Sequence, residues 1–133
     1  MKKSIKSVFT CLCLVVLIAS MATMVFATEV TFSSKLVDSN DWTYITSGKK
    51  ETKTSTADLK FTALYKDDGS ASNYWRIYAK ATSSGTKTYV EKGSYYALAI
   101  PSSYQAAGCY VSLYLMGHTP SLDCKASGSW VIH

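Results

Sequence analysis

Alternation of apolar and polar residues constrains the fold of this chain more than any other feature. Residues 58–65, 74–81 and 109–116 place an apolar side chain at every second position, as in Leu59 and Phe61. A period of two belongs to a β-strand with one buried face, whereas an amphipathic helix repeats every 3.6 residues. We therefore predict three strands, each of which must bury its apolar side against a second layer.

Shorter β-prone stretches lie between clusters of turn residues. Their Thr, Tyr, Val and Trp content favours strands at 29–32, 42–45, 86–91, 95–100 and 129–132. A helix is expected only as a single turn within 101–107. About seven to eight short strands with turns every 8–12 residues predict an all-β, antiparallel β-sandwich.

The N-terminus has the pattern of an export signal. Lys2, Lys3 and Lys6 precede an apolar run over 11–26, which ends in Val25-Phe26-Ala27. This order predicts a helical secretory signal peptide over 1–27, cleaved after Ala27, and a β-sandwich domain over 28–133. The alternative is a membrane anchor, but the run is at the short end for a hydrocarbon layer of roughly 30 Å.

Cleavage would change the charge of the chain. The whole sequence has a net charge of +5, with 14 basic and nine acidic residues, and three of the basic ones lie in the signal. The 106 remaining residues therefore carry +2, which removes the main argument for nucleic-acid binding. We predict a secreted, extracellular or cell-envelope protein that meets the membrane only through its signal peptide, and Lys49-Lys50 is interpreted as a solvated loop tip.

Two cysteines, Cys109 and Cys124, lie outside the signal. An exported chain meets an oxidising environment, so we predict that these two residues form a disulfide. The alternative is two free thiols. A redox or metal site is not expected, because the spacing of metal-binding and redox motifs is missing from the sequence.

Residues suited to catalysis are few. The histidines are His118 and His133, and Asp123 lies near the first of them in the sequence. Neither the Gly-x-Ser-x-Gly turn of hydrolases nor a diagnostic zinc spacing accompanies them. We predict that the protein is not an enzyme and has no catalytic residue, no metal and no cofactor; these residues are interpreted as turn residues.

Tyrosine is the main indication of function, with ten in the chain. Tyr74 and Tyr78 share one face of a predicted strand with Arg76 between them, and Tyr110 and Tyr114 share a face of another. Tyrosine offers a large amphipathic contact area, so we predict that these five residues bind a partner. The alternative is structural, since aromatic pairs across strands also stabilise sheets.

The tryptophans are divided between interior and surface. Trp75 and Trp130 are predicted to lie in the core. Trp42 follows a polar loop, and the sequence leaves open whether it is exposed.

Two resemblances follow from these residues, one over a short segment and one over the layout of the whole chain. The segment Ala107-Gly108-Cys109-Tyr110-Val111 resembles the start of the penultimate strand of immunoglobulin-like domains, which implies that the Tyr110 hydroxyl bonds back to the backbone of the corner. The layout of a signal peptide, an all-β chain and a closing Gly128-Ser129-Trp130 resembles small exported bacterial β-sandwich proteins, some of them bacteriocin-like.

These observations predict a secreted, non-catalytic binding or interaction module. Its ligand would be an extracellular protein or glycan, held by the tyrosine-rich face of a sheet. The alternatives are a bacteriocin-like toxin or effector and a small hydrolase.

Overall fold

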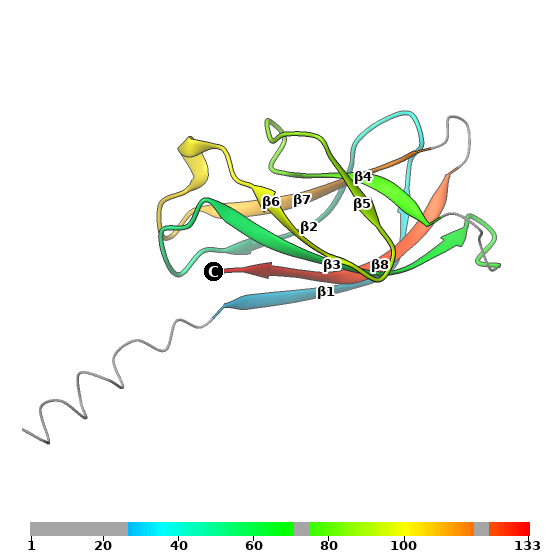
Figure 1. The fold of residues 1–133 in the computed structure, drawn as a ribbon, viewed down its shortest axis with the longest axis horizontal. Coiled ribbons are helices and arrows are strands. Elements are labelled where there is room, and N and C mark those ends of the chain that lie inside the picture. Colours follow the sequence, from blue (N-terminus) through cyan, green and yellow to red (C-terminus); the bar gives the residue numbers. More distant parts are fainter. Residues whose placement is uncertain (1–26, 71–74, 119–122) are drawn as a thin grey trace, which may run out of the picture.

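The protein is a sandwich of two four-stranded antiparallel sheets (Figure 1). The computed structural model describes residues 27–70, 75–118 and 123–133. The strands are β1 (Thr28–Val37), β2 (Thr43–Lys49), β3 (Thr56–Lys66), β4 (Arg76–Ala81), β5 (Thr88–Glu91), β6 (Tyr95–Ala99), β7 (Tyr110–Gly117) and β8 (Cys124–Ile132). The predicted all-β sandwich is confirmed, and each predicted strand overlaps an observed one.

The strand order identifies the type of sandwich. The first sheet has the order β1-β8-β3-β6 and the second sheet the order β2-β7-β4-β5. Strands therefore pair from the outside of the sequence inward: β1 with β8, β2 with β7, β3 with β6 and β4 with β5. This nested pairing is that of one long hairpin rolled up on itself, the arrangement of an eight-stranded jelly roll.

The jelly-roll order differs from that of an immunoglobulin domain. In that family the first two strands are neighbours in one sheet, whereas here β1 and β2 belong to different sheets. The short segment around Tyr110 that resembles the immunoglobulin family therefore does not extend to the topology.

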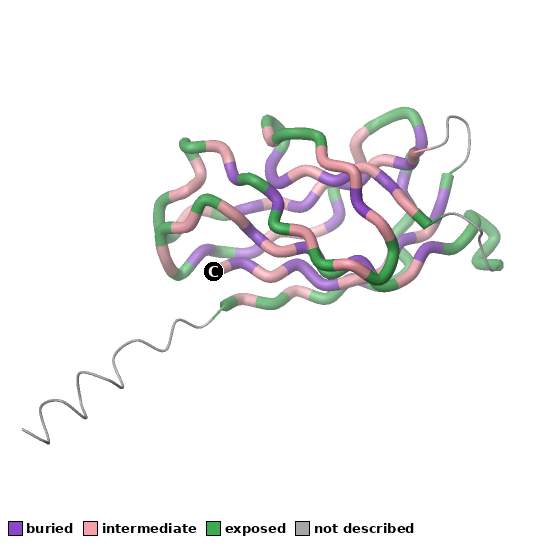
Figure 2. The backbone as a smooth tube through the Cα atoms, viewed as in Figure 1, coloured by how far each residue is buried: buried purple, intermediate pink, exposed green. Residues whose placement is uncertain are grey.

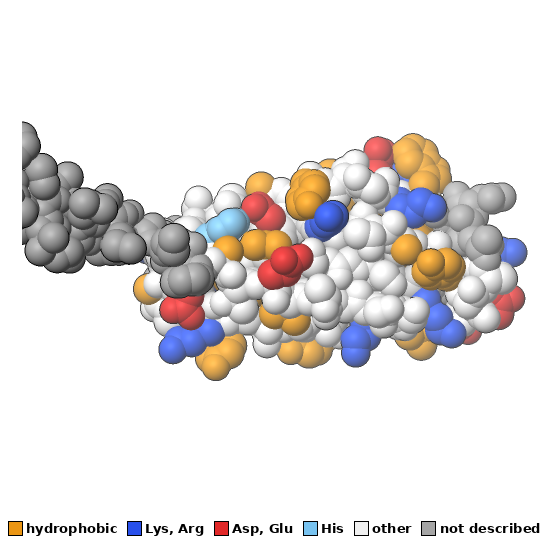
Figure 3. Space-filling view, turned by 90° about the horizontal axis from the view of Figure 1, so that it is seen from below, with side chains coloured by type: hydrophobic (Ala, Val, Ile, Leu, Met, Phe, Trp, Pro, Cys, Tyr) orange, Lys and Arg blue, Asp and Glu red, His pale blue; other side chains and the backbone are white. Residues whose placement is uncertain are grey.

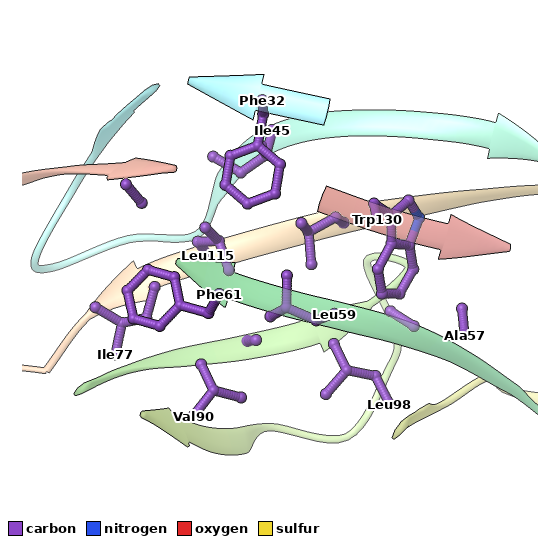
Figure 4. Close-up of a cluster of buried hydrophobic side chains, with 14 of the residues drawn as sticks. Phe32, Ile45, Ala57, Leu59, Phe61, Ile77, Val90, Leu98, Leu115 and Trp130 are labelled. Atoms are coloured by element: carbon purple, nitrogen blue, oxygen red, sulfur yellow. The ribbon is translucent and has the colours of Figure 1, made fainter. Parts of the chain in front are cut away.

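The core lies between the two sheets and consists of the inward residues of both (Figure 4). Leu59, Phe61 and Trp130 of the first sheet face Ile77 and Leu115 of the second, and all five are buried. Burial alternates along β4 and β7, as the period of two predicts (Figure 2). The indole N–H of Trp130 donates to the carbonyl oxygen of Val111 across the sandwich, at 3.3 Å. The predicted core position of Trp130 is confirmed.

Helical structure is minor in the described part of the chain. A single 3₁₀ turn, Ser102–Tyr104, lies inside the stretch where one helical turn was expected. No helix among the described residues is long and apolar enough to cross a membrane. The predicted signal peptide lies outside the described residues except for Ala27, which directly precedes β1.

The predicted disulfide is wrong: Cys109 and Cys124 are both free. Cys109 directly precedes β7, and Cys124 begins β8 beyond the other end of β7. A disulfide needs Cα atoms within about 7 Å, but the eight residues of β7 extend by about 3.3 Å each. A full strand therefore separates two residues that are only 15 positions apart in the sequence.

Lys50 also departs from its prediction, because it is fully buried rather than solvated. Its ammonium group donates to the carbonyl oxygens of Thr54 and, at 2.7 Å, of Gln105. Its backbone N–H donates to the carbonyl oxygen of Cys109 at 2.9 Å. Burial lowers the pKa of Lys50, and the nearby Cys109 thiol acts in the opposite direction. Lys50 therefore joins two loops at one end of the sandwich.

Candidate functional site

The two tyrosine-bearing strands singled out in the sequence are neighbours in the second sheet. β4 and β7 pair so that Tyr78 lies opposite Met116 and Lys80 opposite Tyr114. The apolar residues between them, such as Ile77 and Leu113, are buried, so the tyrosines lie on the outer face. The structure thus brings Arg76, Tyr78, Tyr110 and Tyr114 onto one surface. Tyr74 lies outside the described residues.

Tyr78 belongs to a cluster of three rings. Tyr89 of β5 lies opposite it in the register, with ring centroids 5.2 Å apart. The imidazole of His118, at the end of β7, lies 5.4 Å from Tyr78 and 5.0 Å from Tyr89. Such tilted and edge-on arrangements are favourable for aromatic pairs. The cluster holds Tyr78 in place between β5 and the end of β7.

A second aromatic cluster surrounds Tyr114. The ring of Tyr44, on the edge strand β2, lies 5.8 Å from that of Tyr114 in an edge-on arrangement. The Lys80 ammonium lies 4.3 Å from the Trp42 ring centroid and 5.6 Å from that of Tyr114. It also donates to the carbonyl oxygen of Ser83 at 2.7 Å. Lys80 is therefore fixed in position by a backbone acceptor and two rings.

Arg76 packs between two aromatic side chains. Its guanidinium carbon lies 4.4 Å from the Trp75 ring centroid and 4.9 Å from that of Tyr89. The predicted core position of Trp75 is wrong, because Trp75 is 49% exposed. Trp75 lies just before β4 begins at Arg76, so the alternation that buries Ile77 does not extend to it.

A third cation completes the pattern, since the Lys87 ammonium lies 3.6 Å from the Tyr78 ring centroid. We call this surface the aromatic face. It consists of the ring and cation side chains on the outside of the second sheet: Trp42, Tyr44, Trp75, Arg76, Tyr78, Lys80, Lys87, Tyr89, Tyr114 and His118.

The sequence prediction found the centre of the aromatic face and missed its borders. Tyr44 comes from β2, Lys87 from the turn before β5 and Tyr89 from β5. Their strands are short or interrupted, so alternation is weak there. Trp42, for which the sequence predicts neither burial nor exposure, is half-buried beneath Lys80. The signal that was present in the sequence is the nearness of Lys80 and Lys87 to tyrosines along the chain.

Tyr110 has a different environment from the rest of the predicted site. It is 64% exposed, at the start of β7, opposite Lys49 of β2. Among the described residues, no hydrogen bond of its hydroxyl back to the corner backbone is present, so the role implied by the immunoglobulin resemblance is not found. Tyr110 extends the outer surface beyond Tyr114, by about 13 Å along the strand.

The two histidines and Asp123 lie apart. His118 packs on the tyrosines of the second sheet, while His133 bonds to the Asp58 carboxylate at 3.0 Å. Asp123 accepts a hydrogen bond from the Ser39 backbone N–H at 3.0 Å, at the opposite end of β8 from His133. Within the described ranges, no three His, Cys, Asp or Glu side chains are close enough to hold a metal ion.

The opposite side of the molecule has a different character. Viewed from the side of β1, acidic and basic side chains are dispersed among hydrophobic and other uncharged ones (Figure 3). On the first sheet the recorded cation–ring contact is Lys60 over Tyr95, at 5.2 Å, and His133 pairs with Asp58 nearby. Interleaved cations and rings extending over several strands are thus a property of the second sheet.

The aromatic face is suited to binding. Rings offer apolar area, hydroxyl and indole groups offer hydrogen bonds, and fixed cations offer charge. Comparison with models of protein families, with curated proteins and with solved structures finds no match to this chain. Jelly rolls have many unrelated functions, so the function of this protein must be inferred from the aromatic face itself.

Proposed function

We propose that residues 28–133 form an exported, non-catalytic module that binds an extracellular protein or glycan through the aromatic face. The proposal rests on one observation. On a single sheet surface, Arg76, Tyr78 and Tyr114 contact rings from β2 and β5. A core would bury such rings, but here they share an outer face with three cations.

The organisation of this surface supports binding over a purely structural role. Aromatic pairs stabilise a sheet without charged groups above them. Here Arg76 and Lys80 each contact two rings, and Lys80 is further held by the Ser83 carbonyl oxygen. Long side chains held in place before a ligand arrives lose less conformational entropy on binding. A preorganised surface of this kind is what a binding module needs.

Export is part of the same proposal. The basic start, the apolar run and Val25-Phe26-Ala27 favour a signal peptide. The first strand begins at Thr28, the residue after the proposed cleavage site, so cleavage there leaves every strand intact. Mass spectrometry of protein secreted from the full chain should find Thr28 as the first residue. Recovery of only the uncleaved chain in the membrane fraction would contradict this part of the proposal.

The binding test compares two triple variants of the mature domain. Arg76→Ala/Tyr78→Ala/Tyr114→Ala removes the centre of the aromatic face. Lys60→Ala/Tyr65→Ala/Tyr95→Ala removes one cation and two tyrosines from the first sheet, where Tyr65 and Tyr95 are exposed. Circular dichroism and thermal unfolding establish that both variants are folded.

Binding of the labelled domain is then measured on isolated cell-envelope polysaccharide and on surface proteins separated from it. The proposal expects the variant of the aromatic face to lose binding and the variant of the first sheet to keep it. Equal binding by the two folded variants would contradict the proposal. The bacteriocin-like and hydrolase alternatives stay predictions.

A further inference from the structure

The cations of the aromatic face are held by rings. Lys87 lies over Tyr78, Lys80 over Trp42, and Arg76 between Trp75 and Tyr89. A ring attracts a cation through its quadrupole but carries no net charge. The three side chains therefore keep their full positive charge while their positions are restricted, which is the state in which a cation can best receive an anion.

Neutralising carboxylates are scarce on the same strands. The outward positions of β4, β5 and β7 carry a single acidic residue, Glu91, opposite Arg76 in the register. In the described part of the chain the one recorded ion pair is His133 with Asp58, on the first sheet. The aromatic face is thus locally positive although the predicted mature domain carries only +2.

The cations follow the strand direction. Arg76 and Lys80 are four residues apart on β4, which places their Cα atoms about 13 Å apart. Lys87 lies over Tyr78, the residue midway between them. This row of positive groups, flanked by the rings of Tyr89 and Tyr114, fits a ligand with repeated negative charges and flat, partly apolar units between them.

Sugar polymers supply repeated negative charges and flat, partly apolar units better than proteins do. The centres of protein interfaces are rich in Arg but poor in Lys, whereas two of the three cations that lie over rings here are lysines, Lys80 and Lys87. Sugar rings have C–H faces that pack on Tyr and Trp, and uronic acids or sulfated sugars add an anion to each unit. Nucleic acid would also supply anions and rings, but a domain of net charge +2 is a weak match for its charge density.

We propose that the aromatic face binds an anionic polysaccharide, with Arg76, Lys80 and Lys87 contacting its acidic groups and the neighbouring rings packing on its sugar units. This inference rests on the proposed binding function of the same face and names its ligand class.

The test uses probes that differ only in charge. Affinity of the mature domain is measured for polygalacturonate and its methyl ester, and for dextran sulfate and dextran. Poly-L-glutamate and single-stranded poly(dT) represent anionic peptides and nucleic acid. The variant Arg76→Gln/Lys80→Gln/Lys87→Gln removes the three cations, and Lys35→Gln/Lys53→Gln/Lys66→Gln removes three exposed cations elsewhere.

We expect the domain to bind at least one charged polysaccharide at least about tenfold more tightly than its uncharged form, the step that 1.4 kcal/mol represents. The Gln variant of the aromatic face should lose about that factor, while the control variant changes less than about twofold. Binding by the wild type should weaken as salt is added, because surface charges are screened.

The test distinguishes a failure of the polysaccharide inference from a failure of the proposed binding function. Equal affinity for charged and uncharged polysaccharides, or no affinity for any of them, would overturn the polysaccharide inference. Tighter binding of poly-L-glutamate or poly(dT) than of both charged polysaccharides would also overturn it. In each case the proposed binding function stands if the Ala variant of the aromatic face still loses envelope binding, and falls if that variant binds as the first-sheet variant does.

Discussion

The ammonium nitrogen of Lys87 lies 3.6 Å from the centroid of the Tyr78 ring, the shortest cation–ring distance recorded among the described residues. Lys87 belongs to the turn before β5 and Tyr78 to β4, so this contact ties the turn to the centre of the aromatic face. The pair shows how the second sheet positions positive charge without using a carboxylate.

We predict that this contact stabilises the fold. In a double-mutant cycle with Lys87→Met and Tyr78→Leu, the coupling energy from urea unfolding should be about 0.5–1 kcal/mol, the range of exposed cation–π pairs. Lys35→Met, far from the ring on β1, serves as the control and should show no coupling to Tyr78→Leu. A coupling of zero for Lys87 would contradict the contact.

Thr82 occupies a strained backbone position, and we predict that Thr82→Gly stabilises the protein. Its φ of 63° is unfavourable for a β-branched residue, and its buried hydroxyl has no hydrogen-bond partner. Relief of such strain is worth about 1–3 kcal/mol, offset by about 1 kcal/mol for the flexibility of glycine in the unfolded chain. Urea unfolding should show a net gain of about 1 kcal/mol. Thr88→Gly, in the regular strand β5, should destabilise instead.

The two cysteines should react as separate thiols of unequal accessibility. Cys109 is partly exposed and Cys124 is buried. A disulfide-exchange reagent added to the native protein, tested as residues 28–133 so that Cys109 and Cys124 are its only cysteines, should therefore modify Cys109 first and reach Cys124 only after denaturation. Cys109→Ser should abolish the fast reaction and leave the slow one. The prediction would be contradicted if the native protein had no reactive thiol and a mass two hydrogens lower than that of the reduced chain, because these results indicate a disulfide.

The pH dependence of stability should carry a contribution from Cys124. Burial raises the pKa of its thiol from 9.0 to about 11. The folded state thus keeps a proton that the unfolded state releases, so this contribution is complete below pH 9 and is lost as the pH rises toward 11. Two pKa units correspond to roughly 2–3 kcal/mol. The difference in unfolding free energy between wild type and Cys124→Ala should narrow over this window, and a constant difference would contradict the prediction.

We predict that the buried Lys50 stabilises the folded protein, although lysine is usually a surface residue. Lys50→Met keeps the length of the side chain but leaves the carbonyl oxygens of Thr54 and Gln105 without their donor. Unpaired buried acceptors cost about 1–3 kcal/mol each, and removing a desolvated charge offsets part of this. We expect a net loss of about 1–2 kcal/mol in urea unfolding. Exposed Lys49→Met is the matched control and should change stability by less than about 0.5 kcal/mol.

For the candidate site, the sequence predicts which side of a strand a residue lies on but not which strands are neighbours. Alternation placed Arg76 and Tyr78 on one side of a strand and Tyr110 and Tyr114 on one side of another, and the structure joins these sides because β4 pairs with β7. Nothing local indicated that β5 would add Tyr89. The partner of a strand depends on the pairing of the whole chain, whereas the side on which a residue lies depends only on its own strand.

The errors have the same physical origin. The separation of two cysteines in sequence does not show that a strand between them moves them apart. The residue type of Lys50 does not show that two loops from distant parts of the chain supply its acceptors.

The all-β class, the approximate strands and the buried side of each strand can be read from the amino-acid sequence. The nested jelly-roll order, the free thiols and the surface that combines rings with cations depend on tertiary contacts. Periodicity is a local property, encoded over a few residues, whereas pairing and burial arise from contacts between residues far apart in the chain.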